Sequence, residues 1–165
     1  MGYVAAQLTG AFCGAMFGFM LKGNGGTIGI IGDHYILQAC VSETFVSFLF
    51  IFVILMMTED STAISKDVGI RAFVVASAVG SLLTYNTANV TPSMNPGVAL
   101  PLYLTMIMDH GSDLLKYIWI HMIFPFVGAV ISVAVFEHIY KPALHLVNTS
   151  IKEGNAINEP LLGNS

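Results

Sequence analysis

Charge is what this sequence has least of. Only 10% of its 165 residues are Asp, Glu, Lys or Arg, compared with roughly 25% in an average soluble domain. Six Lys and Arg residues are too few to build a basic surface for nucleic acid. The net charge of −4 comes mostly from predicted loops and from the C-terminal tail. We therefore expect no nucleic-acid partner and no soluble globular domain.

Cysteine is scarce as well, with Cys13 and Cys40 as its two occurrences. Each lies in or beside an apolar run, and their spacing is not that of metal ligands, so we interpret both as small hydrophobic residues. The sequence contains no recognisable nucleophile–base pair, metal-ligand cluster or phosphate-binding glycine loop. It therefore predicts no enzyme, no metal site and no other cofactor.

Apolar residues make up 55% of the chain, and the mean hydropathy is +0.76. A helix needs about 20 residues to cross a bilayer, at a rise of 1.5 Å each. Four runs approach or exceed that length and are predicted to be transmembrane helices, the third being the shortest. They are residues 3–21, 36–57, 68–85 and 117–140.

A fifth apolar run, about residues 96–108, is too short to cross. It follows Asn95 and begins with Pro96, a pair typical of a helix start, because Asn caps free amides and Pro suits the first turn. A capped half helix among spans indicates backbone that enters the bilayer and turns back. The predicted fold class is an all-α membrane protein with four transmembrane helices and one re-entrant half helix.

The ends of the chain are predicted from charge and polarity. Four of the six basic residues fall on one side of the predicted spans, which favours a cytoplasmic location for both termini. Residues 143–165 are polar and are predicted to be a disordered cytoplasmic tail. Whether the host membrane is the plasma membrane or an intracellular one stays open.

Small residues recur at helical spacing in three of the predicted spans. Such stripes let membrane helices approach closely and gain dispersion contacts, so we expect a packed bundle. The candidate packing residues are Ala6, Gly10, Gly14 and Gly18 in the first span, Gly80 in the third and Gly128 in the last.

Asn95 is the sharpest candidate for function. At the start of a half helix, its side chain and the first free amides would put partial positive charge beside a cavity. A pore lined in this way would orient water by its oxygen and repel cations, including protons. The alternative is an ordinary N-cap of a helix outside the membrane.

Glu43 lies inside the second predicted span, where an ionisable group is costly unless it has partners. The candidate partners are free amides in residues 86–93, which favours a supporting role over a proton-relay or ion-binding role. His121 is interpreted as an interhelical hydrogen-bonding residue. A membrane-embedded enzyme using Glu43 and His121 would need the two to meet across helices, and nothing in the sequence ensures that.

Four motifs in order make the chain resemble the major intrinsic protein (aquaporin) family, over nearly its whole length to Pro142. The resemblance implies a channel in which Glu43 supports a pore loop and residues 95–97 form the second Asn-Pro-Ala box, with Gly97 in the Ala position. It also implies a homotetramer. The motifs are residues 3–11 (YVAAQLTGA), 42–45 (SETF), 93–97 (SMNPG) and 124–129 (FPFVGA).

A complete family member has six spans and two such boxes in an inverted repeat. The resemblance assigns this sequence to spans three to six and to the second box alone. Residues 1–142 are therefore expected to form an incomplete aquaporin-like right-handed bundle, as a fragment or truncated form of a channel.

The resemblance also assigns a selectivity filter. Val98 occupies the position after the box, where the family commonly has Arg, and Pro92, with Ser81 or Leu83, supplies the neighbouring positions. A filter without Arg is less polar, so glycerol and hydrogen peroxide become plausible solutes beside water. The predicted function is a passive channel for water or small neutral solutes. The alternative is a non-transporting scaffold or regulatory subunit that associates with full-length channels.

Overall fold

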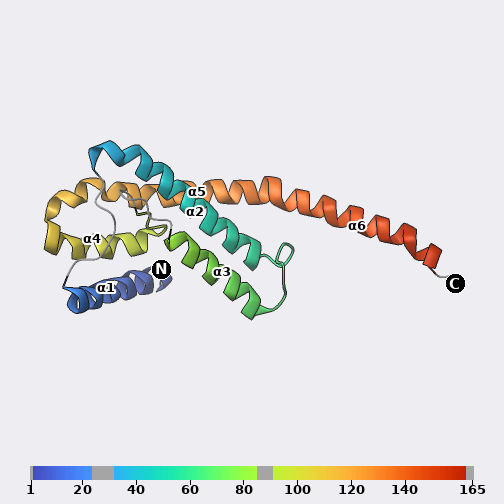
Figure 1. Ribbon diagram of the computed structural model, residues 1–165, viewed down its shortest axis with the longest axis horizontal. Helices are drawn as coiled ribbons and strands as arrows, with labels where there is room; N and C mark the ends of the chain where they lie inside the picture. The colour runs from blue at the N-terminus through green and yellow to red at the C-terminus, as the bar shows by residue number, and fades with distance from the viewer. Residues whose placement is uncertain (1, 24–31, 85–90, 163–165) are drawn as a thin grey trace.

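The computed structural model describes residues 2–23, 32–84 and 91–162, with side chains through residue 152 (Figure 1). Every regular element in these ranges is helical, which confirms the all-α class. The elements are α1 (Gly2–Lys22), the short helix η1 (Asp33–Tyr35), α2 (Ile36–Thr58), α3 (Val68–Leu83), α4 (Pro96–His110), η2 (Ser112–Tyr117), α5 (Ile118–Val135), the π-helical turn η3 (Phe136–Tyr140) and α6 (Lys141–Leu162).

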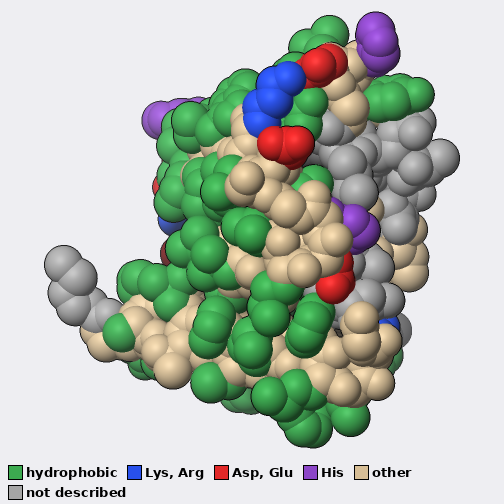
Figure 2. Space-filling view, turned by 90° about the vertical axis from the view of Figure 1, so that its left-hand side faces the viewer, with side chains coloured by type: hydrophobic (Ala, Val, Ile, Leu, Met, Phe, Trp, Pro, Cys, Tyr) green, Lys and Arg blue, Asp and Glu red, His purple; other side chains and the backbone are tan. Residues whose placement is uncertain are grey.

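Three helical segments in the described ranges are long and apolar enough to cross a membrane: Gly2–Lys22, Asp33–Thr58 and Ser112–Lys152. Large hydrophobic side chains cover much of the outer surface, as Figure 2 shows for one end of the bundle. Outward-facing apolar side chains on this scale suit lipid and not water. The chain is therefore an integral, multi-pass membrane protein.

The third predicted span differs from the other three in length. α3 is apolar but has only 16 residues, or about 24 Å at 1.5 Å per residue. That is less than the roughly 30 Å of a hydrocarbon core. The predicted end of this span, residue 85, lies outside the described residues.

Helices α2 and α5 form the centre of the fold, and they pack against each other along their lengths. Gly128 of α5 lies directly against the α2 backbone. A Cβ built on it would meet Thr44 O and would lie 2.9 Å from both Phe48 N and Ser47 Cβ. Only glycine allows so close an approach of two helices. α3 packs against α2, and α4 packs against both α5 and α1.

The helix ends follow from local chemistry. Asp67 caps α3, its carboxylate accepting a hydrogen bond of 3.0 Å from Ile70 N. Gly23 follows α1 with φ +70°, and Gly111 follows α4 with φ +79°. These left-handed conformations favour glycine, and they let the chain leave each helix sharply.

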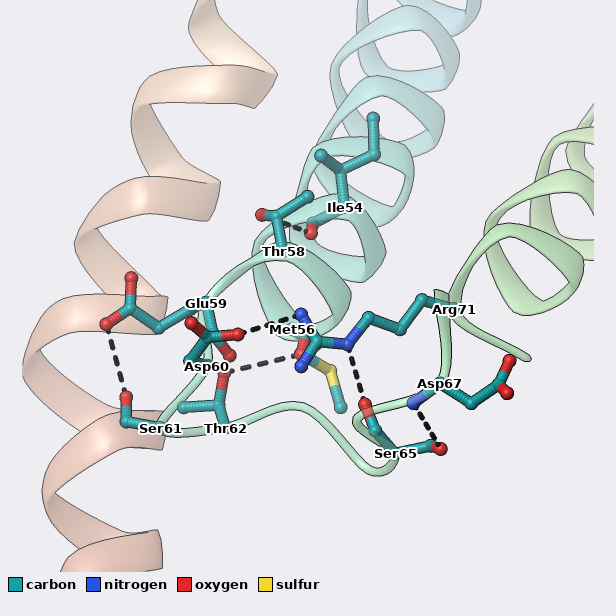
Figure 3. Close-up of polar contacts among 10 residues, drawn as sticks. All are labelled: Ile54, Met56, Thr58, Glu59, Asp60, Ser61, Thr62, Ser65, Asp67 and Arg71. Carbon is teal, nitrogen blue, oxygen red and sulfur yellow. Dashed lines mark hydrogen bonds and ion pairs between the residues drawn. The ribbon is translucent and has the colours of Figure 1, made fainter. Parts of the chain in front are cut away.

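The connection between α2 and α3 is an ordered turn (Figure 3). Arg71 at the start of α3 donates to Ser65 O at 2.6 Å and to Asp60 Oδ1 at 2.9 Å. Thr62 is buried and donates back to Met56 O at 3.3 Å. Lys141, at the start of α6, lies 3.4 Å from Glu59 of this turn. These contacts tie the end of α2 to both α3 and α6.

The segment expected to be a disordered tail is helical in the structure as far as Leu162. α6 continues the direction of α5 through η3 and extends away from the bundle (Figure 1). The prediction rested on polar composition, which does not prevent a helix that is already nucleated by the preceding turns from propagating.

The expected glycine stripes also have a different setting from the one predicted. A Cβ built on Gly10, Gly14, Gly18 or Gly80 meets no other atom within 4 Å. In the described residues α1 contacts α4 alone, and Ala6 is exposed. Of the predicted packing glycines, only Gly128 lies at a helix–helix contact in this chain.

Candidate functional site

The start of α4 is held by its own capping residue. Asn95 has extended backbone angles, φ −148° and ψ 115°, and its Oδ1 accepts a hydrogen bond of 2.8 Å from Gly97 N. Pro96 occupies the first turn, where no amide hydrogen bond is lost. The remaining first-turn amides and the helix dipole place partial positive charge at this point.

Glu43 of α2 fixes the two residues that precede Asn95. Its side chain is fully buried and accepts three hydrogen bonds: from Ser93 N at 2.8 Å, from Ser93 Oγ at 2.6 Å and from Met94 N at 2.8 Å. Met94 has φ +57°, in the left-handed region. This strained residue turns the chain so that consecutive amides face one carboxylate.

The amides that bond Glu43 belong to residues 93 and 94. The partners predicted for Glu43 from the sequence are the amides of residues 86–93, of which 86–90 lie outside the described residues. Ser93, at the edge of that stretch, is a partner, and Met94 is one residue beyond it. A buried carboxylate that accepts several N–H bonds is compensated for its loss of water.

His121 of α5 lies beside the same carboxylate. Its Nδ1 is 3.4 Å from Glu43 Oε2, and the two side chains are 1% and 0% exposed. The ring of Tyr103, from α4, lies 5.6 Å from the His121 ring, centroid to centroid. Side chains of three helices, α2, α4 and α5, therefore meet around His121. The sequence offers no reason to expect that contact, because it depends on the register of α2 against α5.

The proposed filter residues fall in different environments. Val98 is 40% exposed and lines a cavity of about 330 Å³ between α1 and α4. Pro92 is buried. Ser81 and Leu83 are exposed on α3, which contacts α2 and not α4 among the described elements. The structure thus leaves Val98 facing open space and does not bring Ser81 or Leu83 to it.

Gln7 is a neighbour of the site that the candidate residues did not include. Its Oε1 would lie 3.8 Å from a Cβ built on Gly97, so α1 presents an amide group to the first turn of α4. The available signal was a polar residue within an otherwise apolar span. Gln7 and Asn95 thus both place polar side-chain atoms at the first turn of α4, the turn that also carries Val98.

No group of three or more His, Cys, Asp or Glu side chains in the part of the chain that the structure describes could hold a metal ion. The site instead offers hydrogen-bond donors at a helix start, held by a buried carboxylate and bordered by apolar side chains. Such an arrangement orients small dipolar molecules and disfavours cations.

The fold and the site together define a class of protein. It is a helical membrane protein in which a short, capped helix is anchored to a buried carboxylate. The Major intrinsic protein family model matches residues 1–136, and the chain belongs to that family. Aquaporin AqpM of Methanothermobacter thermautotrophicus is 29% identical over 146 residues, which cover 83% of this chain and 57% of AqpM. The chain thus spans little more than half the length of that relative. No solved structure matches it significantly.

Proposed function

We propose that this chain forms part of a passive transmembrane channel for water and small neutral solutes, with glycerol and hydrogen peroxide among them. The observation that carries the proposal is the anchoring of the α4 start. Three hydrogen bonds to Glu43 and the Asn95 cap hold a half-length helix with its positive end beside a cavity. Membership of the family and the name of the relative AqpM support the same function.

In this proposal α4 is a re-entrant half helix and Asn95 lies at the narrow part of the pathway. Donors at Asn95 and in the first turn hydrogen-bond the oxygen of a passing solute, while the positive helix end opposes cations. Val98 contributes an apolar wall where a charged residue would narrow and polarise the pathway. The channel therefore admits neutral polyols and hydrogen peroxide as well as water. No enzymatic step is part of this function.

The assembly and orientation belong to the same proposal. Both termini lie in the cytoplasm, the lipid bilayer is the constant partner, and four copies of the channel associate as a homotetramer. The outer surfaces of α2 and α5 carry large exposed hydrophobic side chains, which suit either lipid or a neighbouring copy.

Reconstituted vesicles test the proposal. The chain is purified in detergent, incorporated into liposomes and exposed to osmotic gradients of sucrose or glycerol, with vesicle volume followed by light scattering. Wild type is expected to accelerate volume change over empty liposomes. Asn95→Asp retains the helix cap but replaces amide donors by a charge. We expect solute flux about tenfold lower, the effect of losing about 1.4 kcal/mol of hydrogen bonding in the pathway.

Asn148→Asp is the matched control, because Asn148 is exposed on α6, away from the site. Its flux is expected to equal that of wild type. The proposed pathway through Asn95 is wrong if wild type accelerates the passage of neither water nor glycerol. It is also wrong if Asn95→Asp and Asn148→Asp give the same flux.

The second candidate is a scaffold or regulatory subunit that associates with intact channels and does not itself transport. The glycine stripe of α1 favours it, since a Cβ built on Gly10, Gly14 or Gly18 meets no described atom within 4 Å, and Gly14 and Gly18 line the cavity between α1 and α4. Co-purification with a full-length relative, lost in Gly14→Leu, would support this function. A solitary monomer in detergent would count against it.

A further inference from the structure

The contact between Glu43 and His121 is a buried pair of ionisable side chains that the hydrogen bonding of α4 does not require. Glu43 already accepts three hydrogen bonds from residues 93 and 94. His121 lies beside the same carboxylate, with Nδ1 3.4 Å from Oε2. That separation exceeds the 2.7–2.9 Å of a charge-assisted hydrogen bond.

Neither ring nitrogen of His121 makes a hydrogen bond with any described residue, although the side chain is 1% exposed. A buried imidazole without hydrogen bonds is unusual, and it carries a cost in free energy. The neutral ring has one N–H, and a tautomer with that proton on Nδ1 would offer an uncharged donor to the nearest acceptor, Glu43 Oε2. The doubly protonated ring would also bring a positive charge next to this anionic oxygen, so the arrangement favours a change of charge.

The other ionisable groups near α5 do not compete for this position. Glu43 and Tyr103 are the groups that contact His121 itself. Within the described ranges, the elements packed against α5 carry Cys40 and Glu43 (α2), Tyr103, Asp109 and His110 (α4), Asp113, Lys116 and Tyr117 (η2), and Glu137, His138 and Tyr140 (η3). Lys116 is exposed and bonded to Asp33 at 2.7 Å, so it does not neutralise Glu43.

We propose that His121 is a proton-responsive positioning residue, which acts through Glu43 on the start of α4. With His121 neutral, the ring brings no charge to the carboxylate, which is held by its bonds from residues 93 and 94. When the imidazole binds a second proton, its charged Nδ1–H donates to Oε2, and the buried negative charge becomes part of an ion pair. The carboxylate is then held by α5 as well as by residues 93 and 94.

The consequence for the site is mechanical. Oε2 also accepts the Ser93 N–H at 2.8 Å, so any shift of the carboxylate toward His121 moves the backbone that leads into Asn95. Protonation is expected to tighten this anchor and acidification to stabilise the bundle.

The first test does not depend on transport. Thermal unfolding of the full chain in detergent is measured at about pH 5 and pH 8 for wild type, His121→Gln, Glu43→Gln and the double variant. We expect wild type to have a higher Tm than His121→Gln, and this difference in Tm to be about 2–4 °C larger at the lower pH. In the Glu43→Gln background this pH-dependent difference should vanish. The proposal fails if the difference is the same at both pH values, or survives without Glu43.

His145→Gln is the matched control, because His145 is exposed on α6 and should show no such coupling. A second readout is the pH titration of the side-chain nitrogen signals of His121 by NMR, which should change in Glu43→Gln. A purely structural role for His121 would leave both readouts unaltered.

The effect on flux rests on the proposed function and is measured separately in liposomes. Wild type is expected to change its solute flux by about fivefold between the two pH values, within the range of ordinary coupling energies, and His121→Gln to lose that response. Coupling in Tm without any flux would support the pair and overturn the channel. Flux with a pH response that His121→Gln retains would support the channel and overturn the pair.

Discussion

Gly128 offers the sharpest measure of how α2 and α5 hold together, through the variant Gly128→Ala. A single methyl group added there would lie 2.9 Å from Phe48 N and from Ser47 Cβ, and closer still to Thr44 O. Two of these three atoms belong to the α2 backbone, so no rotamer change can remove the overlap. The two helices have to separate or rotate.

The size of the effect follows from the distances. Ordinary contacts between non-bonded carbon atoms are about 3.5–4.0 Å, so the helices must separate by about 0.6 Å or more at this point. Overpacking of a tight core typically costs about 1–3 kcal/mol. Because the obstacle here is backbone, we expect a loss near the upper end, about 3 kcal/mol. The same interface contains Glu43 and His121, so their contact should loosen too.

The assay is equilibrium unfolding of the purified protein in mixed micelles, with helix content followed by circular dichroism. Gly14→Ala is the matched control, since a Cβ at Gly14 meets nothing within 4 Å. That change should leave stability equal or raise it by about 0.5–1 kcal/mol, the usual preference for Ala over Gly in a helix.

The reasoning about the α2–α5 contact would be refuted by equal unfolding curves for Gly128→Ala and Gly14→Ala. A loss in both variants would refute the open setting of α1 instead. The two substitutions are chemically identical, so differences in helix propensity cannot account for any gap between them.

Three further substitutions probe other parts of the fold. Glu43→Gln replaces the carboxylate that accepts three hydrogen bonds and should lower the unfolding free energy by about 2–4 kcal/mol, measured by denaturant titration. Met94→Val places a β-branched residue at φ +57° and should cost about 1–3 kcal/mol in the same assay. Asp33→Asn removes the negative charge that pairs with Lys116 and accepts from Tyr117; it should leave the midpoint unchanged, because exposed ion pairs contribute little.

Each of these substitutions has a control or a contrary result. Glu137→Gln alters an exposed carboxylate and should have little effect; a loss equal to that of Glu43→Gln would contradict the anchoring role. Met108→Val is made at a 58% exposed helix position and should cost much less than Met94→Val. For Asp33→Asn, a large and salt-sensitive drop in midpoint would show that the η1–η2 contact matters more than its exposure implies.

The spans and the capped helix could be predicted from sequence because each depends on local chemistry. Apolar length predicts α1 and α2 within a residue or two, and the Asn95–Pro96 pair predicts a helix that begins where α4 does. The need of Glu43 for partners could be predicted as well, since an ionised group in the bilayer requires them. Family membership, expected from four ordered motifs, is confirmed.

The contact of His121 with Glu43 could not be predicted, because it depends on how deeply α5 lies against α2. That depth is set by Gly128, whose significance as a contact appears only once its neighbours are known. Conversely, Gly10 and Gly14 have the spacing of packing residues but no packed neighbour in the described chain. The spacing of glycines in a sequence shows which face of a helix lacks side chains. It does not show whether another helix packs against that face.

The continuity of α5, η3 and α6 has a mechanical consequence. The 22 residues of α6 extend about 33 Å at 1.5 Å per residue. They project from the bundle, and η3 is the one described element that packs against them (Figure 1). A tilt of about 10° at the root would displace the far end by about 6 Å, by the same rise per residue. A small movement at the α2–α5 contact is thereby enlarged along α6 toward Leu162, the last residue of the helix, where an attached spectroscopic probe would report it.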